Sequence, residues 1–160
     1  MRYEHLIEIN NPLLPLLDPL DRNDLWQGLV RRAYAPEQFI LGLEGAHVQI
    51  LSGEGATTVL QRTLNYGTFR VNDTVTLRQD EAVITEVAGG AGVARARLTI
   101  TIEEPAAGRL YLRFLYELDQ DEPAAGLDAV TADLRRQAWF ASDMDTVARI
   151  RELAAMRRRQ

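Results

Sequence analysis

The chain has 160 residues, of which 46% are hydrophobic and 26% charged, and its formal net charge is −5. This length and composition are those of one globular domain spanning residues 1–160, and they argue against a disordered chain. Cysteine and lysine are both absent, so disulfides, thiolate chemistry, cysteine-bound metals and lysine Schiff bases are excluded.

The acidic charge and the lack of long apolar runs limit the partners of the chain. Net negative charge disfavours a whole-molecule attraction to nucleic acid. No apolar run approaches the roughly 20 residues that cross a membrane, and the N-terminus lacks a signal-peptide pattern. We therefore expect a cytoplasmic protein, monomeric or homodimeric, that binds no nucleic acid and has no stable membrane association.

The N-terminal part predicts one strand followed by two helices. Residues 3–9 are β-prone and end at a cluster of turn formers. Asp21 is a good N-cap for a helix that continues for about fourteen residues to a proline. Apolar residues at i and i+4 give this helix one apolar face, so we expect Arg31 and Arg32 to face outward or cap its C-terminal end. Residues 36–40 predict a second, short helix.

The middle of the chain, residues 44–118, alternates between apolar and polar positions. Turn signals recur about every ten residues, which predicts an antiparallel meander and not βαβ units. A hairpin that turns at residues 66–67 pairs Arg62 with Val71. The last hairpin of the meander pairs Ile100 with Leu112. Both registers place the large apolar residues on one face, as a sheet buried on one side requires.

The C-terminal part predicts one long helix over residues 127–157, which has to cross the whole sheet. An apolar stripe follows one side of this helix. Its members are Leu127, Val130, Leu134, Ala138, Ala141, Met144, Ala148 and Met156, widened by Val147, Ile150 and Leu153.

This order of elements resembles the helix-grip fold of the START-like (SRPBCC) superfamily, which includes birch-pollen-type plant allergens, lipid-transfer domains and aromatic polyketide cyclases. More closely, the chain resembles a bacterial and fungal branch of pathogenesis-related-allergen-like proteins of unknown function. The segments that carry the closer likeness are residues 3–6, 25–33, 101–105, 137–138 and 144–145, with Pro36 and Phe39. The resemblance implies an α+β fold with a seven-stranded curved antiparallel sheet, two short helices and a long C-terminal helix over the concave face.

Small inward residues motivate a ligand cavity between the sheet and the final helix, and the resemblance favours it. The alternative is that the alanines permit tight packing and the core is solid. The apolar lining residues predicted for this cavity are Phe69, Val71, Ala96, Leu98, Ile100, Leu112, Phe114, Leu134, Ala138, Ala141 and Met144.

Two charged residues interrupt the apolar inner face. Arg62 and Asp73 are diagonal neighbours in the predicted register, and burying either charge alone would cost several kcal/mol, so we expect them to pair. The pair would orient the polar end of a ligand, or it would be purely structural. Tyr116 and Gln137 are further orienting candidates, or they satisfy each other or a water.

Other motifs give no site. His5 and His47 lie in different strands, so neither a metal centre nor a catalytic histidine arrangement is supported, and we predict no catalytic residue, metal or cofactor. Three functions remain. The leading one is a module that binds a small hydrophobic molecule, aromatic or polyketide-like. The rival is a cyclase or aromatase that works without metal or cofactor, and the third is a protein-interaction module.

Overall fold

The computed structural model of the protein describes residues 1–11, 13, 17–90, 94–120 and 127–160. One of the predicted turns of the meander, near residue 90, lies in part outside the described residues. The elements in chain order are β1 (Arg2–Glu8), α1 (Arg22–Tyr34), the 3₁₀ turn η1 (Pro36–Gln38), β2 (Gly45–Glu54), β3 (Thr57–Asn65), β4 (Arg70–Arg78), β5 (Ala82–Val87), β6 (Ala96–Ala106), β7 (Arg109–Leu118) and α2 (Leu127–Arg158).

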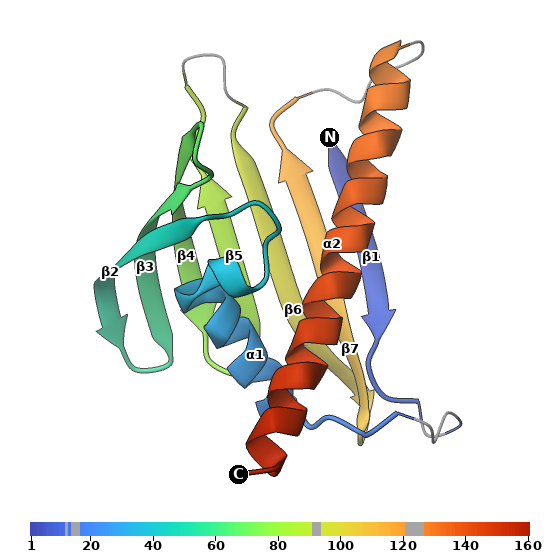
Figure 1. Cartoon of the computed structure of the whole chain (residues 1–160). Coiled ribbons are helices and arrows are strands. Elements are labelled where there is room, and N and C mark those ends of the chain that lie inside the picture. The colour runs from blue at the N-terminus through green and yellow to red at the C-terminus, as the bar shows by residue number, and fades with distance from the viewer. Residues whose placement is uncertain (12, 14–16, 91–93, 121–126) are drawn as a thin grey trace.

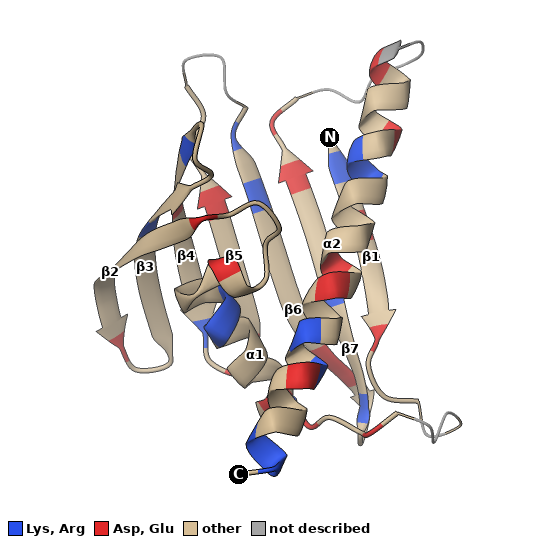
Figure 2. Ribbon diagram, in the orientation of Figure 1, with Lys and Arg blue, Asp and Glu red and all other residues tan. Residues whose placement is uncertain are grey.

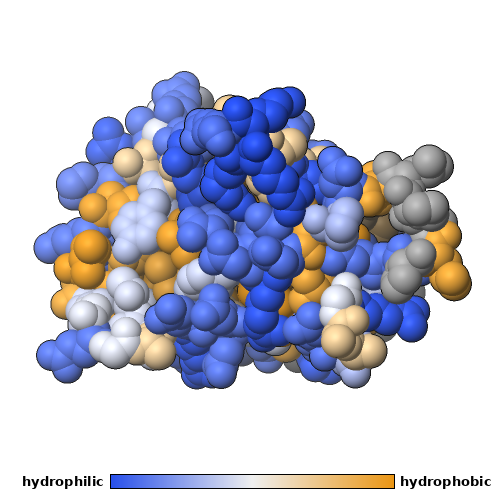
Figure 3. Space-filling model, turned by 90° about the horizontal axis from the view of Figure 1, so that it is seen from below, coloured by the Kyte–Doolittle hydropathy of each residue, from blue (hydrophilic) through white to orange (hydrophobic). Residues whose placement is uncertain are grey.

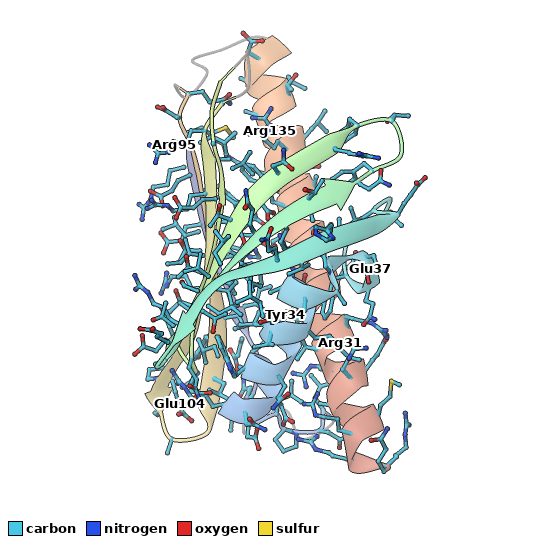
Figure 4. The ribbon with its side chains drawn as sticks, turned by 90° about the vertical axis from the view of Figure 1, so that its left-hand side faces the viewer. Arg31, Tyr34, Glu37, Arg95, Glu104 and Arg135 are labelled. Atoms are coloured by element: carbon cyan, nitrogen blue, oxygen red, sulfur yellow. The ribbon has the colours of Figure 1, made fainter. Side chains whose placement is uncertain are left out.

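The strands form one antiparallel sheet in the order β1-β7-β6-β5-β4-β3-β2. Strand β1 joins the end of the meander, so the N-terminal strand lies beside β7 and under α2 (Figure 1). Both helices lie on the concave side of the sheet. Figure 4 shows Arg95 and Glu104 on the opposite, outer side, while β2, β3 and β4 slant across the view toward α2. The predicted architecture, with its long closing helix, is confirmed.

Helix α1 begins with a reciprocal capping box. The Asp21 carboxylate accepts a hydrogen bond from the Asp24 backbone N–H at 2.7 Å, and the Asp24 carboxylate accepts one from the Asp21 N–H at 2.9 Å. Asp24 also accepts hydrogen bonds from Arg157 at 3.1 Å and Arg158 at 2.6 Å. These arginines belong to the basic C-terminal end of α2 (Figure 2), so one buried carboxylate joins the start of α1 to the end of α2.

Asp24 should make stability depend on pH in the acid range. Burial by itself would raise its pKa, but the Asp21 N–H and the two guanidinium groups outweigh that effect and lower it. A carboxyl with a lowered pKa stabilises the folded state above its unfolded-state value of about 3.9, and that stabilisation is lost as the pH falls through the folded-state pKa. We expect Asp24→Asn to lower the free energy of unfolding by about 1 kcal/mol near neutral pH and by much less near pH 3. Urea denaturation at both pH values measures this, with the exposed Asp145→Asn as control. Equal losses at both pH values would contradict the assignment.

Helix α2 turns a different face to the sheet from the one predicted. Its buried residues are Ala132, Asp143, Thr146, Val147, Ile150 and Ala154. The other five lie three, four, seven or eleven residues from Asp143 and so share one side of the helix with it. Most of the predicted stripe lies on the opposite side of the helix. Leu134 and Met144 are 59% and 45% exposed, and Ala138 and Ala141 are exposed as well. The prediction that these four residues face the sheet is wrong, because the inner side carries polar residues that the apolar pattern passes over.

The predicted strand registers are each wrong by two residues. Strands β3 and β4 pair Arg62 with Asp73, not with Val71, because the connection between them runs over residues 66–69 and is longer than a two-residue turn. Strands β6 and β7 pair Ile100 with Phe114, because their turn lies at residues 107–108. A shift of two residues keeps every side chain on its predicted face, so the inner and outer faces of the sheet are as expected.

The core is concentrated where α1 and α2 meet the sheet. Leu25 and Leu29 of α1 are fully buried, together with Ile150 of α2 and Leu112 of β7. The two helices approach closely at Gly28, where an added Cβ would lie 2.5 Å from Ile150 Cγ1. Among the described residues, no helix combines the length and apolar character needed to cross a membrane.

Candidate functional site

Arg62 and Asp73 form a buried, bidentate ion pair on the inner face. Arg62 Nε donates to Asp73 Oδ1 at 2.8 Å and Nη2 donates to Oδ2 at 2.6 Å, and both side chains are almost fully buried. Arg62 Nη1 also donates to the carbonyl of Ala33 at 2.9 Å. The pair therefore ties β3 and β4 to the C-terminal end of α1. The expected pairing is confirmed, although the residues are direct partners across the two strands and not diagonal neighbours.

A second polar group, which we call the His5–Asp143–Tyr116 network, joins β1, α2 and β7. Tyr116 donates its hydroxyl hydrogen to Asp143 Oδ1 at 2.5 Å, and His5 Nε2 lies 2.5 Å from Asp143 Oδ2. The Asp143 side chain is completely buried. Burial raises the pKa of Asp143, although hydrogen bonds from Tyr116 and His5 act against that effect. Burial, with the nearby Asp143 charge, also raises the pKa of Tyr116, so the phenol keeps its proton and acts as a donor.

Aromatic rings surround this network. The rings of Tyr116 and Trp139 stack with centroids 4.3 Å apart and an interplanar angle of 7°. Tyr3 stacks on Trp139 and on His5, at 5.9 and 5.6 Å. His5 also stacks on Phe114, with ring centroids 5.4 Å apart. Aromatic rings therefore line the inner face next to α2, and the three hydrogen-bonding side chains of the network lie among them.

Arg32 is a third polar group, and the structure places it inward. The buried residues of α1 include Leu25, Gly28, Leu29 and Ala33, and Arg32 falls in the middle of that face, seven residues after Leu25. Its Nε is buried and has no hydrogen-bond partner, and no ion pair joins Arg32 to any other described residue. Burial lowers the pKa of Arg32, and the groups whose charges act on it include Tyr116, Arg62 and Asp143. The prediction that Arg32 faces outward or caps the helix is wrong.

The inner face of the sheet is filled at one end and accessible at the other. Around α1, Val75, Leu77, Val83, Ile100 and Ile102 are fully buried. Further along the same strands the inward residues keep accessible surface. We call these residues the open end of the inner face: Tyr3, Val71, Thr85, Val87, Ala96 and Leu98. Alternation along the strands turns them toward the concave side, so side chains from the rest of the chain cover this end less completely.

The predicted site residues are therefore dispersed. Val71, Ala96 and Leu98 belong to the open end, Tyr116 is in the network, and Arg62 and Asp73 pair with each other. Ile100, Leu112 and Phe114 are packed in the solid core. Phe69 is 57% exposed in the connection before β4, stacked on Tyr66. Gln137 is exposed on the outer side of α2 with Leu134, Ala138, Ala141 and Met144.

His5, Arg32 and Asp143 are the interior polar residues that sequence reasoning missed. A signal for each was present. His5 alternates with Tyr3 and Ile7 in an inward series, and Arg32 is spaced at i+7 from Leu25. Asp143 precedes Ile150 by seven residues, which places both on the same side of α2. In each case the period of the element marks a polar residue as part of the buried face.

Two of the pockets in the structure lie away from this region. One of about 370 Å³ lies at the base of the molecule between Ile9, Asn10, Leu17, Pro19 and Gly108. One of about 180 Å³ separates α1 from the β2–β3 turn. Seen from below, much of the centre of the surface is hydrophilic, and hydrophobic atoms gather toward its two sides (Figure 3). Within the described ranges, no cluster of three or more His, Asp or Glu side chains is arranged to hold a metal ion.

Solved structures share this arrangement. Ara h 8.0201 has a TM-score of 0.56 and 12% identity, with 98% of each chain covered. The ZhuI aromatase/cyclase from Streptomyces sp. R1128 has a TM-score of 0.59 and 12% identity, covering 98% of this chain and 94% of that one. The di-domain aromatase/cyclase StfQ of the steffimycin pathway has a TM-score of 0.66 and 8% identity. The match covers 99% of this chain and 52% of StfQ, so the chain spans about half of StfQ.

The protein thus has the helix-grip fold seen in allergen and aromatase/cyclase structures, as the resemblance implied. The family to which the chain belongs is more specific than this shared fold. The family description of AtaL, acetylaranotin biosynthesis cluster protein L, matches residues 7–157, and the chain belongs to the AtaL family. A search of curated proteins gives no match.

Proposed function

We propose that this protein binds a small, largely apolar molecule, aromatic or polyketide-like, between the open end of the inner face and α2. The observation that supports the proposal most directly is the contrast along the sheet. Inward residues around α1 are fully buried, whereas those of the open end keep accessible surface. Flat rings of Tyr3, Tyr116 and Trp139 border this end, and such surfaces suit an apolar, unsaturated ligand. Membership of a family named after a biosynthesis-cluster protein agrees with that class of molecule.

Native mass spectrometry of the protein purified from its own organism tests this directly. We expect an extra mass that denaturation releases. Leu98→Trp would fill the open end with a larger side chain and should lower the occupancy severalfold. Leu6→Trp is the matched control, because Leu6 is exposed on the outer face of β1. An adduct that both variants retain equally would remove the open end as the binding site.

A cyclase or aromatase function is the second candidate, and the His5–Asp143–Tyr116 network favours it. Both oxygens of Asp73 accept hydrogen bonds from Arg62, so this carboxylate belongs to a structural pair. Asp143 differs, because burial raises its pKa and its carboxyl lies within hydrogen-bond distance of the His5 ring and the Tyr116 hydroxyl. The network thus supplies the acid–base chemistry that an aldol-type ring closure requires.

Turnover of a poly-β-ketone surrogate, followed by chromatography and mass spectrometry, tests this second function. We expect cyclised product with the unmodified protein and at least a tenfold lower rate with Asp143→Asn. Asp145→Asn changes an exposed carboxylate two residues away and should keep the full rate. Equal rates in all three proteins, or no product at all, would leave binding alone as the function.

A further inference from the structure

Arg32 bears on the class of ligand that the open end takes, and a role for it in ligand binding rests on the proposed function. A guanidinium carries a positive charge at any ordinary pH and offers five N–H donors. Arg62, the neighbouring interior arginine, spends three of these donors on Asp73 and Ala33. Arg32 has no such partner within the described part of the chain, and its Nε is buried. A buried polar group without a partner is costly and rare in native proteins.

The acidic groups near Arg32 are already engaged. The Asp143 carboxylate accepts hydrogen bonds from Tyr116 and His5, and Asp73 is bound by Arg62 at both of its oxygens. The remaining neighbours, Tyr116 and Tyr66, are phenols whose pKa is raised, so they carry no negative charge near neutral pH. None of the described groups whose charges act on Arg32 is therefore an anion free to pair with it.

Arg32 lies at the boundary between the filled core and the open end. It is in the last turn of α1, next to Ala33, whose carbonyl accepts from Arg62. The strand register places Arg62 and Asp73 in the same inner row as Val87 and Ala96 of the open end. Arg32 as a whole residue keeps some accessible surface, although its Nε is buried. A ligand at the open end would reach the guanidinium with one of its ends.

We propose that Arg32 binds the anionic oxygen of the ligand, and that the protein selects largely apolar, unsaturated molecules ending in a carboxylate or an enolate. The rings of Tyr3, Tyr116 and Trp139 would contact the apolar body of the molecule, and the guanidinium would pair with its charged end. Arg32 is then a specificity-determining residue, and the ion pair it lacks in the free protein is completed by the ligand.

Two fluorescent probes with one ring skeleton test the proposal. The dye 8-anilinonaphthalene-1-sulfonate carries an anionic group, and N-phenyl-1-naphthylamine is its uncharged parent. We expect Arg32→Gln to weaken sulfonate binding by about ten- to a hundredfold, the range of one charge-assisted hydrogen bond or pair. Binding of the uncharged dye should change less than twofold. Arg32→Lys should keep part of the preference for the anion.

Arg31→Gln is the matched control, because Arg31 is the adjacent residue, is exposed and bonds to Gln38 outside the interior (Figure 4). It should leave both affinities unchanged. A second readout is stability: the ligand-free Arg32→Gln protein should have an unchanged or higher urea midpoint, because an unpaired buried charge is removed. Equal effects of Arg32→Gln on both dyes, or equal effects of the two glutamine variants, would overturn the inference alone. No binding of either dye to the unmodified protein would count against the proposed function itself.

Discussion

Replacing Asp73 by alanine is expected to lower the free energy of unfolding by about 3–5 kcal/mol, the largest loss among the substitutions considered, because it leaves Arg62 buried and without its carboxylate. The geometry supports a large effect: both oxygens of Asp73 accept from Arg62 at 2.6–2.8 Å, and both side chains are almost fully buried. Chemical denaturation followed by circular dichroism measures the change. If the alanine variant does not fold, Asp73→Asn keeps the shape and one acceptor and should lose less.

The double variant Arg62→Met with Asp73→Leu distinguishes two effects: the loss of the ion-pair interaction, and the cost of leaving Arg62 buried without a partner. Well-packed apolar residues often replace a buried pair with little cost, so we expect the double variant to recover most of the stability. Arg97→Met is the surface control, because its pair with Glu86 is about half exposed and should be worth under about 1 kcal/mol. A loss for Asp73→Ala no larger than that of Arg97→Met would show that the pair contributes little.

Gly28→Ala is expected to destabilise the protein by about 1–3 kcal/mol, although alanine is the better helix former by about 1 kcal/mol. The reason is steric. An added methyl would lie 2.5 to 3.0 Å from three side-chain atoms of Ile150, at the contact between α1 and α2. Ile150 is fully buried, so the helices have to separate or the isoleucine has to leave its favoured rotamer.

Thermal and urea unfolding of a double-mutant cycle tests this explanation. Ile150→Ala alone should cost about 2–5 kcal/mol by leaving a cavity. In the double variant the new methyl enters that space, so its total loss should be clearly smaller than the sum of the two single losses. Additive losses would show that the two side chains do not contact each other and that Gly28 acts only through backbone freedom.

Variants of Arg62 and Asp73 are unsuited to tests of ligand binding. From the sequence, Arg62 and Asp73 either orient a ligand or form a purely structural pair, and their contacts with each other and with Ala33 make them part of the framework. Loss of binding in their variants would therefore not distinguish a ligand contact from a weakened fold. Arg32 avoids this difficulty, because its replacement breaks no hydrogen bond or ion pair to another described residue.

The pattern of apolar and polar residues predicts the elements and the face of the sheet on which each strand residue lies. Period-two alternation in the meander and the i, i+4 spacing in the helices follow directly from backbone geometry, and the capping signal at Asp21 marks the start of α1 to the residue. The two register errors left these faces intact, because a slip of two residues along a strand preserves the side of every side chain.

Which side of α2 turns inward, and which polar groups meet, depends on tertiary packing that the helical period does not reveal. Helix α2 carries an apolar stripe on one side, with Leu134 and Met144, and a mixed side with Asp143 and Ile150, and the mixed side is the buried one. The period of the helix predicts that its more apolar side is buried. The side that is buried in the structure also depends on the residues of the sheet against which α2 packs. Here Tyr116 and His5, on strands far apart in the sequence, supply the hydrogen bonds that make a buried carboxylate tolerable.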